Sequence, residues 1–219
     1  MKKLILVLAA AAFLAACGES KKTAEATQEV AQAGTDAIVY SIDPAASKVL
    51  WAGAKKMDVQ HHGTVQLNSG SLAFEGDQLK AGNFTIDMTS IANEDLTVDM
   101  GQTKLIGHLK SADFFMVDSF PTAHFEITRV EPLETEDGAT HKIYGNLTIK
   151  DQTHGISFPA IINQTEAGTT AQAQFEINRN EWGIVWGGSQ ETNKGVVDFL
   201  KDNLLQDMIQ FNVQLVAHQ

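Results

Sequence analysis

Alternation of apolar and polar residues is the strongest pattern in this chain. In the stretch "NFTIDMTSI" at 83–91, Phe84, Ile86 and Met88 are separated by single polar residues. A period of two residues is that of a β-strand with one buried face and one hydrated face. The same period recurs at 48–53, 64–67, 71–74, 123–128, 142–150, 155–163, 171–178 and 208–217. The chain is therefore predicted to be an all-β protein.

Turn residues separate these runs. "NSGS" at 68–71, "EGD" at 75–77, "EDG" at 136–138 and "EAG" at 166–168 predict hairpin loops. About eight strands without helices between them predict an antiparallel barrel or sandwich. "NEWGIVWGG" at 180–188 is predicted to be strand, closely packed at Gly183. Two segments with spacing nearer that of a helix are predicted to be short helices or ordered loops over an open end of the barrel, Leu105–Val117 and Val196–Ile209.

The first 16 residues have the form of a secretory signal peptide. Lys2 and Lys3 precede an uninterrupted apolar run from Leu4 to Ala16, which is shorter than the roughly 20 residues of a membrane-spanning helix. The ending "LAAC" resembles the lipobox of bacterial lipoproteins, so Cys17 is predicted to be acylated and to anchor the chain. The alternative is an ordinary signal peptide with a chance cysteine. Glycine at position 18, by resemblance to lipoproteins of enteric bacteria, favours the outer membrane, facing the periplasm.

Residues 17–37 are predicted to be a flexible tether. The segment has no aromatic residue, and Val30 is its only large aliphatic residue. It therefore buries too little apolar surface to offset the entropy lost on ordering. About 20 residues span roughly 25 Å as a coil and at most about 70 Å when extended. Residues 38–219 are long enough for one domain with a sizeable core, so the expected organisation is a signal peptide at 1–16, a tether at 17–37 and a barrel at 38–219.

The net charge excludes one class of partner. Without Lys2 and Lys3, the chain has 14 basic and 27 acidic residues, a net charge of −13. Nucleic-acid binding needs clustered Lys and Arg, so no nucleic-acid partner is expected. Cys17 is the only cysteine, and no disulfide can form within the chain.

Residues that could carry catalysis or bind a metal are few. Imidazole suits zinc and copper, so four histidines form the candidate metal set. The alternatives are that they make ordinary hydrogen bonds in turns, or that one of them binds the polar head of a lipid. No serine lies in a Gly-x-Ser-x-Gly context, and neither a Walker loop nor a dinucleotide fingerprint is present. The sequence therefore predicts neither an enzyme nor a cofactor. The candidate metal set is His61, His62, His108 and His154.

Longer stretches resemble the YceI-like family of exported, polyisoprenoid-binding proteins. The matching pieces include "YSIDPAASKVLWAG" at 40–53, "HHGTVQLNSGSLAF" at 61–74, "KLIGHLKSADFFMVDSFPTAHFEIT" at 104–128 and "FEINRNEWGIVW" at 175–186. The resemblance extends from Tyr40 to the C-terminus and rests on the order and spacing of these pieces. Met116 and Asp151 depart from the family pattern, which usually has aspartate and glycine there.

The resemblance implies a lipocalin-like, eight-stranded antiparallel β-barrel with one or two short helices. It also implies that a long prenyl chain or another long-chain amphiphile lies in an apolar tunnel. Periodicity alone also allows a barrel that its own side chains fill, because eight strands is close to the size at which the interior is either filled or holds one small ligand. The residues expected to line the tunnel, or else to be ordinary core, are Trp51, Phe84, Met88, Leu109, Phe114, Phe115, Phe125, Trp182 and Trp186.

Three functions follow as hypotheses. The favoured one is a non-enzymatic lipoprotein that sequesters or transports an isoprenoid or quinone-like lipid in the periplasm. The second is a metal- or haem-binding protein of the cell envelope that uses the four histidines. The third is an enzyme acting on the headgroup of a lipid or quinone, for which the sequence offers no catalytic constellation.

Overall fold

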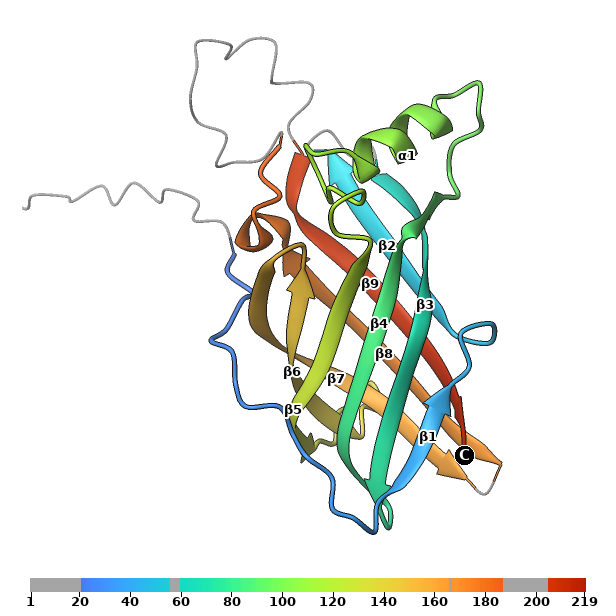
Figure 1. Ribbon diagram of the computed structural model, residues 1–219, viewed down its shortest axis with the longest axis vertical. Helices are drawn as coiled ribbons and strands as arrows, with labels where there is room; N and C mark the ends of the chain where they lie inside the picture. The colour runs from blue at the N-terminus through green and yellow to red at the C-terminus, as the bar shows by residue number, and fades with distance from the viewer. Residues whose placement is uncertain (1–20, 56–59, 166, 187–204) are drawn as a thin grey trace, which may run out of the picture.

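The chain forms one antiparallel sheet that closes on itself into a barrel (Figure 1). The computed structural model describes residues 21–55, 60–165, 167–186 and 205–219, so Cys17 and the signal peptide lie outside the described residues. The elements are β1 (Ile38–Ile42), β2 (Lys48–Lys55), β3 (Gln60–Glu75), β4 (Gln78–Asn93), α1 (Gln102–Lys110), β5 (Thr122–Pro132), β6 (His141–Ile149), β7 (Gln152–Thr165), β8 (Gly168–Asn178), the 3₁₀ helix η1 (Arg179–Trp182) and β9 (Leu205–His218).

Nine strands make an eight-position barrel because β1 and β2 share one position. β1 pairs with residues 71–74 of β3, and β2 pairs with residues 60–65 of the same strand. Both strands also pair with β9. β1 pairs with residues 217–218 of β9, and β2 pairs with residues 205–214. The break between them is a turn in which the Asp43 side chain accepts hydrogen bonds from the N–H groups of Ala45 and Ala46, at 2.9 and 3.1 Å. The predicted closed, eight-stranded antiparallel barrel is confirmed.

The hairpin predicted at 68–71 is wrong, because β3 runs through it without a break. The register between β3 and β4 shifts between Leu67 and Ser69, so an irregularity in one long strand replaces a loop. Gly70 serves close packing: a Cβ there would lie 2.8 Å from Cδ1 of Phe84 and 2.9 Å from the Asn83 carbonyl oxygen. The turn-like residues at 68–71 therefore mark an irregularity within β3 and a close contact at Gly70, and not a hairpin loop.

The other turns lie where the sequence places them. β3 and β4 meet at Gly76, whose φ of 59° is in the left-handed region. The turn before β6 contains Gly138, with a φ of 82°. Thr165 pairs with Gly168 across the hairpin between β7 and β8.

The helical segments are predicted in part. α1 accounts for the start of the first segment, and turns follow it to Val117. Of the second segment, 205–209 belong to β9 and 196–204 lie outside the described residues. The strand predicted at 180–188 is wrong over its described part, because η1 occupies 179–182 and Gly183 after it, with a φ of 66°, turns the chain. Among the described residues, no helix is long and apolar enough to cross a bilayer.

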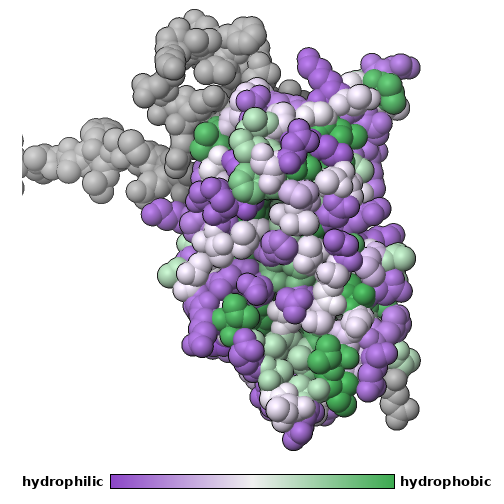
Figure 2. Space-filling view, viewed as in Figure 1, coloured by the Kyte–Doolittle hydropathy of each residue, from purple (hydrophilic) through white to green (hydrophobic). Residues whose placement is uncertain are grey.

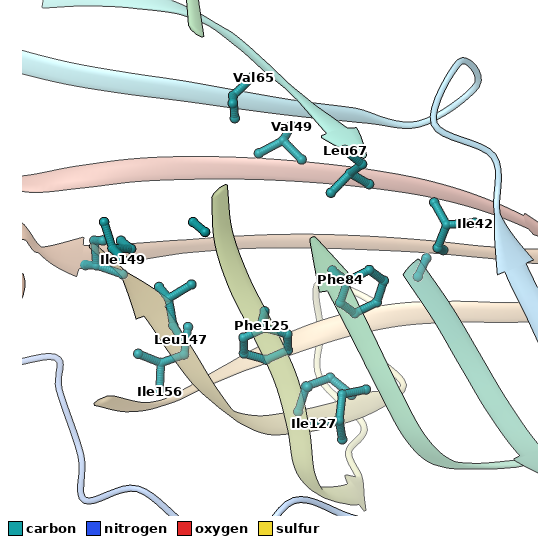
Figure 3. Close-up of a cluster of buried hydrophobic side chains, with 14 of the residues drawn as sticks. Ile42, Val49, Val65, Leu67, Phe84, Phe125, Ile127, Leu147, Ile149 and Ile156 are labelled. Carbon is teal, nitrogen blue, oxygen red and sulfur yellow. The ribbon is translucent and has the colours of Figure 1, made fainter. Parts of the chain in front are cut away.

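Inward-facing side chains from nearly every strand form the core (Figure 3). In that view Val49, Leu67, Phe84, Phe125 and Ile156 come from five different strands and point toward the space that the sheet encloses. The alternation in the sequence follows directly from this arrangement, because each strand has one face toward the interior.

Residues 21–37 form an extended segment, the strap, which lies against the outside of the barrel (Figure 1). Glu25 and Gly155 exchange backbone hydrogen bonds of 2.7 and 3.0 Å. The Asn146 side chain accepts from the Gln28 N–H at 3.1 Å and donates to the Gln28 carbonyl at 2.7 Å. Part of the segment predicted to be a flexible tether is thus docked on the barrel. The docking uses hydrogen bonds of the strap's backbone, which cannot be predicted from its small number of apolar residues.

Candidate functional site

The barrel encloses a cavity of about 570 Å³. Nearly all of the side chains around it are apolar, contributed by β2 to β9 and by α1. A volume of this size is typical of small-molecule sites, which lie between about 300 and 1,000 Å³. The interior is thus not completely filled by its own side chains.

A belt of five phenylalanines crosses the cavity wall. The ring centroids of Phe158 and Phe175 lie 4.4 Å apart and nearly parallel, and Phe211 follows Phe175 at 5.4 Å. On the other side Phe125 lies 5.6 Å from Phe158, and Phe84 lies 6.2 Å from Phe125. The belt presents flat apolar surface, which suits a long hydrocarbon chain.

Gly145 lets the belt pass across β6. Phe125 is on β5 and Phe158 is on β7, so their rings meet over the strand between them. A Cβ at Gly145 would lie 2.2 Å from Cζ and 2.5 Å from Cε2 of Phe125. The missing side chain is what makes room for the Phe125 ring.

The cavity reaches the surface at the end of the barrel that carries α1. Met100, Lys104 and Gln206 line the cavity and are also exposed. The ring of His108, on α1, lies 4.3 Å from the ring of Trp186 and 5.2 Å from that of Phe114. This end is called the mouth below.

The mouth also has the charged groups of the lining. Arg179 is buried, and its guanidinium donates to the carbonyl oxygens of Ile184 at 2.5 Å and Gln206 at 3.2 Å. The same guanidinium lies 5.7 Å from the ring centroid of Phe114. Arg179 therefore links η1, β9 and the segment after α1.

His61 and Asp95 form a partly buried pair at the mouth. Nδ1 of His61 lies 2.8 Å from the Asp95 carboxylate, which also accepts from the His62 N–H and the Asn93 amide. Burial raises the pKa of Asp95, but the hydrogen bonds from His61, the His62 N–H and Asn93 outweigh it and lower that pKa to about 2. His61 lines the cavity, so its hydrogen bond with Asp95 gives the mouth a fixed polar group.

Eight of the nine residues predicted to line a tunnel do line the cavity, and only Trp182 does not. Trp182 is fully buried, donates its indole N–H to the Leu147 carbonyl at 3.0 Å and lies against His154. Binding of lipid by the other eight residues stays a prediction. Sequence reasoning missed Phe158, Phe175 and Phe211, although each shares the inward face of its strand with residues that it placed inside.

The four candidate metal ligands do not come together. His61 pairs with Asp95, His108 lies 3.6 Å from Asp113, and His154 packs on Trp182. His62 is exposed, on the opposite face of β3 from His61. Within the part of the chain that the structure describes, no three His, Cys, Asp or Glu side chains are grouped closely enough to hold a metal ion.

Several solved structures share the fold. BcnA of Burkholderia cenocepacia is 22% identical, with a TM-score of 0.61, covering 80% of this chain and 99% of that one. A polyisoprenoid binding domain from Saccharophagus degradans implicated in plant cell wall breakdown is 14% identical, with a TM-score of 0.56, covering 82% and 97%. A mutant of the YCEI protein of Campylobacter jejuni is 19% identical, with a TM-score of 0.50, covering 68% and 78%.

A comparison with functionally curated proteins finds no match. The profile of the YceI-like domain matches residues 40–217, which include all strands but the first two residues of β1 and the last of β9. The match spans most of the chain, and the barrel geometry agrees with it. The protein therefore belongs to the YceI-like family.

Proposed function

We propose that this protein holds one long isoprenoid or quinone-like amphiphile in its barrel, as a non-enzymatic carrier or store. The observation that carries the proposal is the cavity of about 570 Å³ with an almost wholly apolar wall. Such a wall favours a hydrocarbon chain over any polar ligand. The likeness in fold to a domain described as polyisoprenoid binding supports the same class of ligand.

The energetics allow useful affinity. Enclosing roughly 400 Å² of prenyl chain at about 25 cal/mol per Å² gives about 10 kcal/mol before costs. Association costs of about 4–15 kcal/mol reduce this gain. Binding at micromolar concentration or tighter is therefore within reach, with selectivity that depends on chain length and shape.

The mouth sets the direction of the ligand. The charged side chains of the lining, Lys104 and Arg179, lie at this end together with the imidazole of His61. The wall around the phenylalanine belt has no charged side chain. The hydrocarbon chain would enter first, and a polar headgroup would stay among the charged groups of the mouth.

The proposal includes a place in the cell. Cys17, acylated after removal of the signal peptide, would anchor the protein to a membrane on the periplasmic side, and Gly18 favours the outer membrane. No cofactor besides the bound lipid is proposed.

Native mass spectrometry of the chain exported from a bacterial host tests the proposal. A stoichiometric adduct is expected that solvent extraction removes and that fragments as a prenyl lipid. If the adduct is absent both after expression and after incubation with a mixture of polyprenols, quinones and fatty acids, the proposal is refuted.

A pair of neighbouring residues on β8 supplies matched variants. Ala173 lines the cavity, and Gln174 beside it is exposed on the outer face. Ala173→Trp should fill part of the cavity and abolish the adduct, whereas Gln174→Trp should keep it. Equal retention of lipid by both folded variants would place the ligand outside the barrel.

A further inference from the structure

The strap begins at the mouth. The Glu181 carboxylate, in η1, accepts hydrogen bonds from the Thr23 N–H, the Thr23 hydroxyl and the Ala24 N–H, at 2.9, 2.7 and 2.8 Å. The Asn178 side chain donates to the Lys21 carbonyl at 2.9 Å. These contacts fix residues 21–24 beside η1, whose Arg179 lines the mouth.

From there the strap runs to the opposite end of the barrel (Figure 1). It contacts β7 at Gly155, β6 at Asn146 and β5 at Ile127, whose carbonyl accepts from the Ala31 N–H at 2.9 Å. It ends beside the β3–β4 hairpin, where the Gly34 N–H donates to Glu75 at 2.7 Å. The strap thus follows the length of the barrel, and its N-terminal end is the end at the mouth.

Gly155 is the place where the wall fits the strap. A Cβ at this position would lie 2.5 Å from the Ala26 carbonyl oxygen, and its next nearest neighbours are also strap atoms. The absence of a side chain on the outer face of β7 is therefore explained by the docked strap.

Docking shortens the distance between the anchor and the barrel. Lys21 is four residues after Cys17, so an acylated Cys17 lies within about 14 Å of it even when the chain is extended. A free tether of about 20 residues would allow at most about 70 Å. The barrel is roughly 40 Å long, from 16-residue strands at about 3.3 Å per residue with the usual tilt. The anchor can reach the mouth and cannot reach the far end.

The mouth has an apolar rim beside its opening. Val98 and Met100, in the turn before α1, are 69% and 66% exposed, and Val185, after η1, is 39% exposed. Met100 also lines the cavity. The far end has a second apolar patch, Ile38 and Val39 on β1, and Figure 2 shows hydrophobic surface at both ends of the molecule.

We propose that the strap turns the mouth toward the membrane and that the rim of Val98, Met100 and Val185 contacts the bilayer. The position of the anchor favours this rim over the β1 patch. Asp99, between two rim residues, keeps the contact at the depth of the headgroups. A lipid could then pass between bilayer and cavity with little exposure to water. This inference rests on the proposed acylation of Cys17.

Hydrogen–deuterium exchange on vesicles tests the orientation. The mature chain is coupled through Cys17, its only cysteine, to a maleimide lipid in phosphatidylcholine vesicles, and the reference is the same chain with Cys17 capped. Exchange should slow at least several-fold at 97–101 and 183–186 and stay unchanged at 38–39 and 76–77. Slowing at 38–39, or at neither end, would overturn the proposal.

Two variants test the role of the strap. Gly155→Val should displace the strap, and Glu181→Leu should release its N-terminal end, so both should lose most of the slowing at the rim. Gly107→Ala is the control, because a Cβ there meets nothing within 4 Å. Free exchange of the Glu25 and Ala31 amides would show that the strap has left the barrel. If exchange at the rim is still slowed in such a variant, the strap does not orient the mouth.

The cargo is extracted from the same samples. Rim protection without any bound lipid would refute the proposed function and leave the orientation standing. Bound lipid without rim protection would refute the orientation and leave the proposed function standing.

Discussion

Replacing Gly145 with alanine should destabilise the barrel through one identified clash. The new Cβ would lie 2.2 and 2.5 Å from two atoms of the Phe125 ring and 2.7 Å from the Glu126 carbonyl oxygen. Overpacking of this kind costs about 1–3 kcal/mol, whereas replacing glycine in a strand gains about 0.5–1 kcal/mol. Because two of the clashes are with one aromatic ring, the upper part of the range applies, and a net loss of about 2 kcal/mol is expected.

Gly53→Ala is the matched control, because Gly53 is also on a strand and its Cβ would meet nothing within 4 Å. This variant should be neutral or more stable by up to about 1 kcal/mol. Urea unfolding measures both. With a slope of about 2 kcal/mol per M, the midpoint of Gly145→Ala should fall by about 1 M. If the urea midpoint of Gly145→Ala agrees with that of the wild type within error, the Phe125 ring does not need the space at Gly145.

A double-mutant cycle identifies the partner. Phe125→Leu removes Cζ and Cε2, so the cost of Gly145→Ala should fall by about 1 kcal/mol in that background. Additive effects of the two substitutions would assign the cost to the Glu126 carbonyl or to the backbone.

Three further variants probe other parts of the structure. The pKa of the Asp95 carboxyl group falls from 3.8 to about 2 in the folded chain. Its contribution to stability is therefore complete above pH 3.8 and is lost as the pH falls toward 2. In urea unfolding, Asp95→Asn should be less stable than the wild type above pH 3.8 and should approach it below that pH. Gly63→Ala should cost more than Gly145→Ala in the same assay, because its Cβ would lie 2.0 Å from the Ala92 carbonyl oxygen, and a backbone atom yields less than a ring; a smaller cost would contradict the packing. Arg179→Ala should lower the free energy of unfolding by about 3 kcal/mol, since it breaks the hydrogen bonds of a buried charged group. A loss under about 1 kcal/mol, measured by urea unfolding, would show that Arg179 does not hold η1 and β9 together.

Most of the barrel could be predicted from the sequence because one period governs it. Each strand has one face inside, so the inward residues of "NFTIDMTSI" and "AHFEIT" are readable without coordinates. The turn signals were less reliable. Gly76 marks a turn because its φ requires glycine, whereas Gly70 lies in a strand because Phe84 needs the space. Composition alone does not distinguish these two uses of glycine.

The cavity and the strap were harder to predict. Trp182 and Trp186 look alike in the sequence, but η1 buries the first outside the cavity and leaves the second at its mouth. The strap has few apolar residues, and its backbone groups bond to the Asn146 side chain and to the Gly155 backbone, both far away in the sequence. Neither residue signals this role until the fold brings it beside the strap.

The position of β9 has a consequence for how the chain is made. β9 is the last strand, and it joins β8 on one side to β2 and β1 on the other. A nascent chain without it has two unpaired strand edges, which can pair with other chains. These contacts join residues far apart in the sequence, so closure is a late and slow step of folding. The barrel can therefore be completed only after β9 has been synthesised, and a chain truncated before Leu205 should aggregate.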